Sequence, residues 1–256
     1  MDAKRFADNR FLLKDTIRQQ VDFSQTGQAQ HRPAPPMQQD CAPSLYRISL
    51  PDGQAALTRL AVMPVATAIA LRESVRSYSD APLSLEELSG LLWAVQGVRR
   101  VAGPTTALRT VPSAGARHSF ETYLALSRVA GLAAGIYRYL PFGHELVQIQ
   151  TSPDVALKAS EACLRQGCVA RAAVSFFWTT VPARMEWRYD LAAHKVIALD
   201  AGHVGQNLYL AAEAMGIGVC AIAAYHQDQC DTLLGVDGED EFTIYIAAVG
   251  KKKKMG

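Results

Sequence analysis

The sequence contains few cysteines and none of the spacings that bind a metal ion. Its five cysteines form no CxxC pair and no cluster with histidine, and the six histidines include no HExxH motif. We therefore expect reduced thiols rather than disulfides, and neither a structural zinc nor a catalytic metal. A GxGxxG dinucleotide fingerprint and a GxSxG nucleophile elbow are missing as well.

Long hydrophobic runs are also missing. No apolar stretch approaches the length of a membrane span, and the N-terminal residues MDAKRFADNR contain no signal-peptide core. The sequence therefore predicts a cytoplasmic protein with no membrane segment. At 256 residues, of which 49% are hydrophobic and 20% charged, the chain is expected to bury one substantial core.

The net charge of +2 depends on a run of lysines at the C-terminus. Lys251–Lys254 account for four of the 26 basic residues, so the rest of the chain has 22 basic and 24 acidic residues. A slightly acidic body argues against a nucleic-acid partner. The lysine run, within residues 251–256, is interpreted as a solvated tail.

Residues 1–44 are predicted to form an extended N-terminal arm, ahead of one domain over residues 45–250. A short helix is expected in residues 1–18, but residues 19–44 carry seven Gln and four Pro with few large apolar groups. Such a segment cannot bury enough surface to fold alone, so it should lie on the domain or on a partner subunit.

Strand and helix signals favour an α+β fold with a mostly antiparallel sheet flanked by helices. Strands are expected over residues 45–50, 120–126, 136–140, 145–149, 172–180 and 242–249, several of them joined as hairpins. Ser84 to Glu87 form a capping box ahead of a helix that ends at Gly97. Other helices are expected over residues 61–71 and from Ser152-Pro153 toward Gly167.

The stretch over residues 200–225 is expected to form a long buried helix and a strand. Apolar side chains recur on one helical face, at Val204, Leu208, Ala211 and Met215. A helix this apolar belongs in a core or at a subunit interface. Asp200 is predicted to cap its start and Gly216 to end it. The strand over residues 219–224 ends in two alanines, against which a flat group could lie.

Two short motifs have a structural and a functional interpretation. Arg72-Glu-Ser-Val-Arg76 places two guanidiniums on one side of a helix end, which suits a phosphate. On its own it is better explained as surface arginines bridged to Glu73. Pro112-Ser-Ala-Gly115 is a turn of small residues and, on its own, a plain loop.

Taken together, the helix, the glycine turn, the small-residue strand and these motifs resemble the nitroreductase superfamily of flavin enzymes. The wording AGHVGQNLYLAAEAMGIG is most similar to the SagB-type dehydrogenase branch. The resemblance implies a nitroreductase-like fold, a homodimer with the long helix at its interface, and FMN as the cofactor. It implies that the following residues bind FMN: Arg72, Ser74, Arg76, Ser113, Gly115, Ala224 through its backbone amide, and Lys251.

The segment Met185–Tyr189 departs from the SagB-type pattern. Those enzymes have a Lys-Tyr pair near this position that is thought to take part in proton removal, whereas this sequence has Arg188-Tyr189. Arginine stays charged at physiological pH and is a poor base. Arg188 and Tyr189 are therefore the candidate catalytic residues, with packing at the rim of the flavin pocket as the equal alternative.

The expected function is that of an FMN-dependent oxidoreductase. The first hypothesis is a SagB-type dehydrogenase that acts on a small or peptide-derived heterocycle by hydride transfer through FMN. One alternative is a nitro or quinone reductase that uses NADH or NADPH as electron donor. The other is a flavin-binding partner of a peptide-modifying complex that does not itself turn over.

Overall fold

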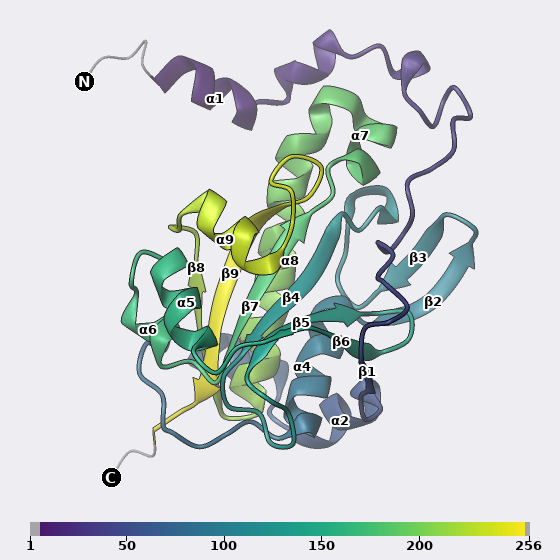
Figure 1. Ribbon diagram of the computed structural model, residues 1–256. Coiled ribbons are helices and arrows are strands. Elements are labelled where there is room, and N and C mark those ends of the chain that lie inside the picture. Colours follow the sequence, from purple (N-terminus) through teal and green to yellow (C-terminus); the bar gives the residue numbers. More distant parts are fainter. Residues whose placement is uncertain (1–5, 254–256) are drawn as a thin grey trace.

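The computed structural model describes residues 6–253 and is built around a seven-stranded sheet (Figure 1). The strand order is β1-β6-β5-β4-β7-β9-β8, and neighbouring strands run antiparallel. A separate hairpin joins β2 and β3. The strands are β1 (Arg47–Ser49), β2 (Val98–Gly103), β3 (Thr106–Arg109), β4 (Phe120–Leu126), β5 (Gly135–Leu140), β6 (Glu145–Thr151), β7 (Val174–Thr180), β8 (Ile217–Ile222) and β9 (Phe242–Lys251).

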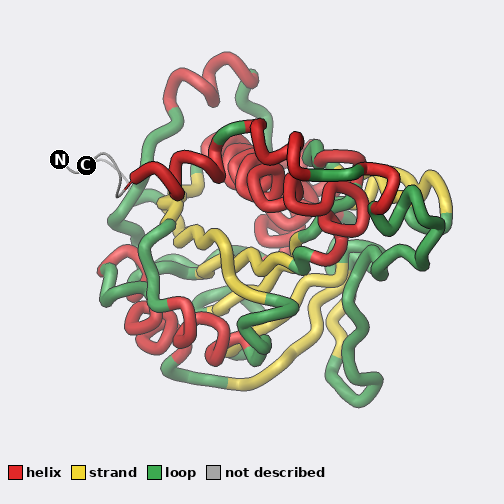
Figure 2. The backbone as a smooth tube through the Cα atoms, turned by 90° about the horizontal axis from the view of Figure 1, so that it is seen from above, coloured by secondary structure: helices red, strands yellow, loops and turns green. Residues whose placement is uncertain are grey.

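Helices cover both faces of this sheet, as Figure 2 shows from above. The side that carries α4 and α8 forms one core cluster, and the side that carries α5, α6 and α9 forms the other. The helices are α1 (Ala7–Leu13), α2 (Gly53–Leu60), α3 (Val65–Leu71), α4 (Leu85–Gln96), α5 (Val155–Ala162), α6 (Gly167–Ala170), α7 (Ala183–Tyr189), α8 (Ala193–Ala214) and α9 (Gln227–Leu234). The expected α+β fold is confirmed.

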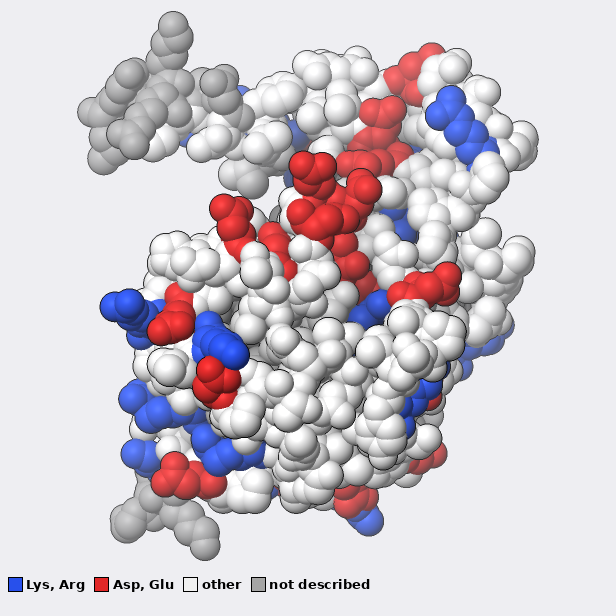
Figure 3. Space-filling view, in the orientation of Figure 1, with Lys and Arg blue, Asp and Glu red and all other residues white. Residues whose placement is uncertain are grey.

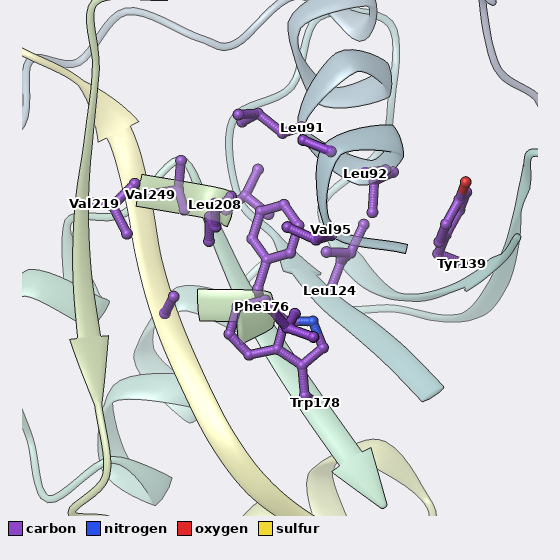
Figure 4. Packing of buried hydrophobic residues seen from close by; sticks show 14 of the residues in the cluster. Leu91, Leu92, Val95, Leu124, Tyr139, Phe176, Trp178, Leu208, Val219 and Val249 are labelled. Atoms are coloured by element: carbon purple, nitrogen blue, oxygen red, sulfur yellow. The ribbon is translucent and has the colours of Figure 1, made fainter. Parts of the chain in front are cut away.

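The central strands β4 and β7 are rich in apolar residues because both of their faces are buried. In β7, Phe176 and Trp178 point toward α4 and α8, whereas Phe177 joins the cluster under α5 and α9 (Figure 4). Every residue of β4 and β7 is buried. The expected strands of the sheet, including that of residues 219–224, begin and end within two residues of their predicted bounds.

The capping box of α4 is confirmed. Ser84 Oγ accepts from the N–H of Glu87 at 3.1 Å, and the Glu87 carboxylate accepts from the N–H of Ser84 at 2.9 Å. The end of α8 is also as expected, since Gly216 adopts a left-handed φ of 70°. Asp200, however, does not cap the long helix. The helix already begins at Ala193, and Asp200 lies in its interior with a buried side chain.

Two other local predictions were wrong. The helix expected over residues 61–71 begins only at Val65, behind Pro64, and a separate helix, α2, is capped by Asp52, whose carboxylate accepts from Ala55 N–H at 3.0 Å. The helix expected from Ser152-Pro153 starts at Val155, and its N-cap residue, Asp154, makes no side-chain capping bond. The glycine-rich stretch before residue 110 forms the β2-β3 hairpin.

The N-terminal arm runs across the end of the molecule that carries α7 (Figure 1). It contains α1 and two 3₁₀ turns, Asp15–Gln20 and Phe23–Gln25. Buried arginines of the domain donate to its main-chain carbonyls: Arg184 to Pro36 at 2.7 Å, Arg109 to Met37 at 3.0 Å, and Arg138 to Gln39 at 2.7 Å. The arm thus supplies acceptors that the domain needs.

A single buried carboxylate pairs with two of these three arginines. Glu121 is 2% exposed, pairs with both Arg138 and Arg184, and accepts from Gln39 N–H at 2.8 Å. Burial alone would raise the pKa of Glu121, but the two guanidiniums outweigh it and the net pKa is lowered.

His118 lies in the same cluster as a neutral, buried base. Burial first, and the positive charge of Arg109 second, lower its pKa to about 3. Such a histidine resists protonation in the folded state while it protonates normally in the unfolded chain.

Outside this cluster, the surface carries both basic and acidic side chains. Figure 3 shows basic and acidic side chains on one face, with acidic ones gathered over the loop between α9 and β9, where Asp237, Glu239 and Asp240 are exposed. By length and composition, α2 and α3 taken together, with a 75° bend between them, meet the criteria for a membrane span; within residues 6–253, no helix does so alone.

Replacing Glu121 by Gln should lower the free energy of unfolding by about 3–5 kcal/mol, because it leaves Arg138 and Arg184 buried without a counter-charge. Urea denaturation measures this change. The matched control is Glu145→Gln, which breaks the more exposed pair with Arg47 and should cost less than about 1 kcal/mol. Equal losses in the two variants would contradict the assignment of Glu121 as the central counter-ion.

Stability should fall as the pH drops below 6.5, partly because of His118. Its lowered pKa means that its contribution is fully present above the unfolded value and is lost as the pH falls toward 3. Comparing wild type with His118→Gln, we expect the stability difference to change by about 2 kcal/mol between pH 7 and pH 5. The exposed His226, changed to Gln, is the control. A constant difference for His118→Gln would disprove the neutral, buried state.

Candidate functional site

The Arg72–Arg76 segment leaves the end of α3 and pairs with the outer edge of β8. Arg72 is the C-cap of α3, Ser74 forms a parallel bridge with Val219, and Val75 N–H donates to the Val219 carbonyl at 2.8 Å. Gly218 is required in this strand, since a Cβ there would lie 2.7 Å from the Val75 side chain. The segment is thereby fixed against the end of the sheet.

Tyr209 of α8 ties this segment to the strand. Its hydroxyl is 2.9 Å from Ser74 Oγ and accepts from Ala221 N–H at 2.9 Å. The Arg72 guanidinium carbon lies 5.2 Å from the centre of its ring. Sequence reasoning missed Tyr209, although a tyrosine on an otherwise apolar helix signals a hydroxyl that needs a partner.

Two lysines at the end of β9 are neutralised by carboxylates. Lys251 forms an ion pair with Glu87, and Lys252 is 2.7 Å from Glu213. Neither Arg72 nor Arg76 forms an ion pair with a carboxylate in the described part of the chain. The two arginines therefore offer positive charge to an external anion, whereas the charge of Lys251 is already shared with a carboxylate.

The Pro112–Gly115 turn is held by hydrogen bonds at its centre. Ser113 Oγ accepts from His118 N–H at 2.9 Å, and Ala114 N–H donates to the Asp200 carboxylate at 3.1 Å. Burial raises the pKa of Asp200, and hydrogen bonds from Ser113 and Ala114 offset part of that shift. Asp200 thus organises the turn rather than the start of the long helix.

Gly115 brings the turn against the candidate catalytic pair. It has a φ of 57°, and a Cβ built on it would lie 2.7 Å from both Arg188 Nε and Tyr189 Oη. Any larger residue would be strained and would push the pair away. Arg188 and Tyr189, at the end of α7, therefore lie directly against Gly115 of the turn.

Ala224 lies just beyond the end of β8. Ala223 and Ala224 are exposed, and the carbonyl of Ala224 accepts from Gln166 Nε2 at 2.9 Å. The N–H of Ala224 has no acceptor within residues 6–253. An exposed amide beside small side chains leaves room for a flat ligand to approach the backbone.

The predicted site residues thus form two groups joined by α8. Arg72, Ser74, Arg76 and Lys251 lie around the end of α8 that carries Tyr209, whereas Ser113, Gly115, Arg188 and Tyr189 lie toward Asp200. Nine residues of helix separate Tyr209 from Asp200, about 13 Å at 1.5 Å per residue. Within the described residues, no three His, Cys, Asp or Glu side chains are placed to share a metal ion.

Known proteins resemble this chain in sequence and in fold. Residues 69–251 match the model of the Nitroreductase family. The chain is 32% identical over 181 residues to a Methanocaldococcus jannaschii protein assigned as a nitroreductase, covering 71% of this chain and 87% of that one. It is 28% identical over 133 residues to the trifolitoxin-processing protein TfxB of Rhizobium leguminosarum bv. trifolii, covering 50% of this chain and 36% of that one.

The fold is also that of a solved nitroreductase structure. The crystal structure from Anabaena variabilis superposes with a TM-score of 0.66 and 28% identity over 82% of this chain, which spans 42% of the length of that one. The family match covers most of the sheet together with α4 and α8, the elements that hold both groups of site residues. The chain belongs to the nitroreductase family of oxidoreductases.

Proposed function

We propose that this protein is an FMN-dependent oxidoreductase whose flavin phosphate binds at Arg72 and Arg76. The observation that carries this proposal is a pair of guanidiniums beside β8 that form no ion pair with a carboxylate of residues 6–253. Charge-assisted hydrogen bonds from arginine are the strong way to hold a phosphate. The Ser74 hydroxyl would form a hydrogen bond with the ribityl chain of FMN.

The residues along β8 fit the flavin itself. The small side chains of Ala223 and Ala224 leave the backbone open, and the N–H of Ala224 is available to a ring nitrogen. Bound FMN supplies the hydride chemistry, and a hydrogen bond near its N5 is one way in which a protein tunes it. Lys251 forms an ion pair with Glu87, so its positive charge would be only partly available to the phosphate.

A homodimer is part of the proposal because the site residues lie in two groups along α8. In a dimer paired through this helix, the turn of one subunit would approach the phosphate-binding segment of the other. Exposed apolar side chains support such pairing: Leu199 on α8 is 55% exposed, and Val65 and Ile69 on α3 are also exposed. Leu208 is buried within its own subunit.

The substrate class follows from the relatives and from Arg188. Similarity to the trifolitoxin-processing protein favours the SagB-type reading, in which a peptide-derived heterocycle is oxidised. Similarity to the M. jannaschii protein favours a nitro or quinone reductase that takes electrons from NADH or NADPH. Arg188 stands where the SagB-type enzymes carry a lysine, which weakens the case for oxidation of a heterocycle. We therefore retain both functions as candidates.

The purified protein should be yellow and should release FMN rather than FAD. Arg72→Gln should weaken FMN binding by about 2 kcal/mol, roughly 30-fold in Kd, because one charge-assisted bond to phosphate is lost. Fluorescence titration of the unloaded protein measures this. Arg100→Gln, an exposed arginine on β2, is the control and should bind FMN as wild type does. An unchanged Kd for Arg72→Gln would remove Arg72 from the site.

Tyr189 is proposed to move a proton during turnover. Its phenol lies against the Pro112–Gly115 turn, and the Arg188 guanidinium is 5.5 Å from its ring centre. Tyr189→Phe should lower steady-state turnover on the order of 10²-fold while the Kd for FMN stays the same, as for loss of a general acid or base. Full turnover in this variant would leave Tyr189 as part of the pocket wall.

A further inference from the structure

The N-terminal arm and α7 line an open pocket to which both contribute side chains. Its volume is about 360 Å³, and it is lined by Arg18, Phe23, Thr26, Gln28 and Ala29 of the arm and by Arg188 and Tyr189 of α7. We name it the arm pocket. Small-molecule sites commonly occupy about 300–1,000 Å³, so the cavity has room for one ring with its substituents.

Main-chain contacts fix the wall that the arm supplies. Gln28 N–H donates to the Trp187 carbonyl at 2.9 Å, and Trp187 Nε1 donates to the carbonyl of Arg32 at 3.0 Å. A Cβ built on Gly27 would come within 2.5 Å of the Trp187 indole, so the backbone of the arm lies directly against that ring. The side chains of residues 23–29 are thus held at a defined distance from α7.

Two guanidiniums line this pocket, one from the arm and one from α7. Arg188 forms no ion pair with a carboxylate of residues 6–253. Arg18 lies 4.7 Å from the Phe23 ring centre and has Asp15 as a distant partner, at 3.7 Å. Both of these side chains are largely exposed, so the pair contributes little.

A third guanidinium adds positive charge next to Arg188. Arg117 is buried and lies 5.1 Å from the ring centre of Trp187; burial first, and then the charge of Arg188, lower its pKa. Two nearby carboxylates contact other groups, Glu186 with His194 at 3.0 Å and Asp190 with the N–H of Leu191 at 2.6 Å. Neither forms an ion pair with Arg188, whose guanidinium keeps its N–H donors for an external anion.

The arm pocket also adjoins the predicted flavin contact. Arg188 and Tyr189 line the pocket, and the same two side chains touch Gly115 of the turn. A ligand anchored in the pocket would therefore extend toward the residues that the proposed function places at the flavin.

We propose that the arm pocket binds an oxyanion carried by a substrate, with Arg188 as its main partner and Arg18 as the second. Guanidiniums bind carboxylates and phosphates through paired N–H donors. Phe23 and Tyr189 add two aromatic rings to the lining, which suits an aromatic or heterocyclic body. The inference rests on the proposed function, and the oxyanion has two possible sources: a carboxylate on the electron acceptor or a phosphate of the nicotinamide donor.

Equilibrium binding tests the pocket without any electron transfer. Calorimetric titration with benzoate and with benzamide compares an oxyanion with a neutral group of similar shape, and wild type should prefer benzoate. Arg188→Gln and Arg18→Gln should each raise the Kd for benzoate about tenfold, because a hydrogen bond to a charged group is lost. Arg32→Gln, an exposed arginine on the same arm, is the matched control and should leave this Kd unchanged.

Kinetics then identifies the source of the oxyanion. With 4-nitrobenzoate and 4-nitrobenzamide as acceptors, Arg188→Gln should lower the benzoate-to-benzamide ratio of kcat/KM about tenfold if the acceptor carries it. A constant ratio with a tenfold rise in the KM for NADPH would assign the oxyanion to the donor phosphate.

Three results would overturn the arm pocket: no preference of wild type for benzoate, an unchanged Kd in Arg188→Gln, or an equal rise in Arg32→Gln. Failure of the proposed function would look different. The protein would then retain no FMN, while its binding of benzoate would still depend on Arg188.

Discussion

The burial of α8 against the sheet is the constraint on which the site depends. Val204 and Leu208 are buried in the core that α8 shares with α4 and the central strands, so the helix has one position and one rotation. That rotation aims Asp200 at the N–H of Ala114 and the Tyr209 hydroxyl at Ser74 and Ala221. The Pro112–Gly115 turn and the Arg72–Arg76 segment are thus placed by one rigid element, and the distance between them follows from the rise per residue of α8.

Local signals were sufficient wherever the partner of a group lies within a few residues. Ser84 and Glu87 cap each other across one helical turn. The strands β4 and β7 are predicted from their aromatic and β-branched residues, which favour strands. Asp200 shows the limit. Its sequence context is that of a helix cap, but its acceptor oxygens are used by Ala114, 86 residues away. Only the folded chain brings that amide to the interior of α8.

The sequence predicts the motifs of the candidate site but not the side chains that contact them. Arg72, Ser74 and Arg76 were recognisable from their spacing together with the family resemblance. Tyr209, Glu87 and Glu213 were not predicted as site residues. Each lies on a helix, and the sequence does not show where that helix packs on the sheet. Glu87 and Glu213 neutralise Lys251 and Lys252. Arg72 and Arg76 therefore provide the positive charge that an anion would contact.

The arm shows how a segment with no core of its own can still contribute a surface to a site. Its composition predicts that it cannot fold alone, and few of its side chains are buried. The domain, for its part, buries Arg109, Arg138 and Arg184, and Glu121 of β4 accepts only some of their N–H donors. Carbonyls of the arm accept others, so each part is ordered by the other. The arm also contacts Trp187, so the bonds that hold it on the domain help to fix the wall of the arm pocket. Substitutions in the arginine cluster should therefore weaken ligand binding in the arm pocket as well as lower the free energy of unfolding.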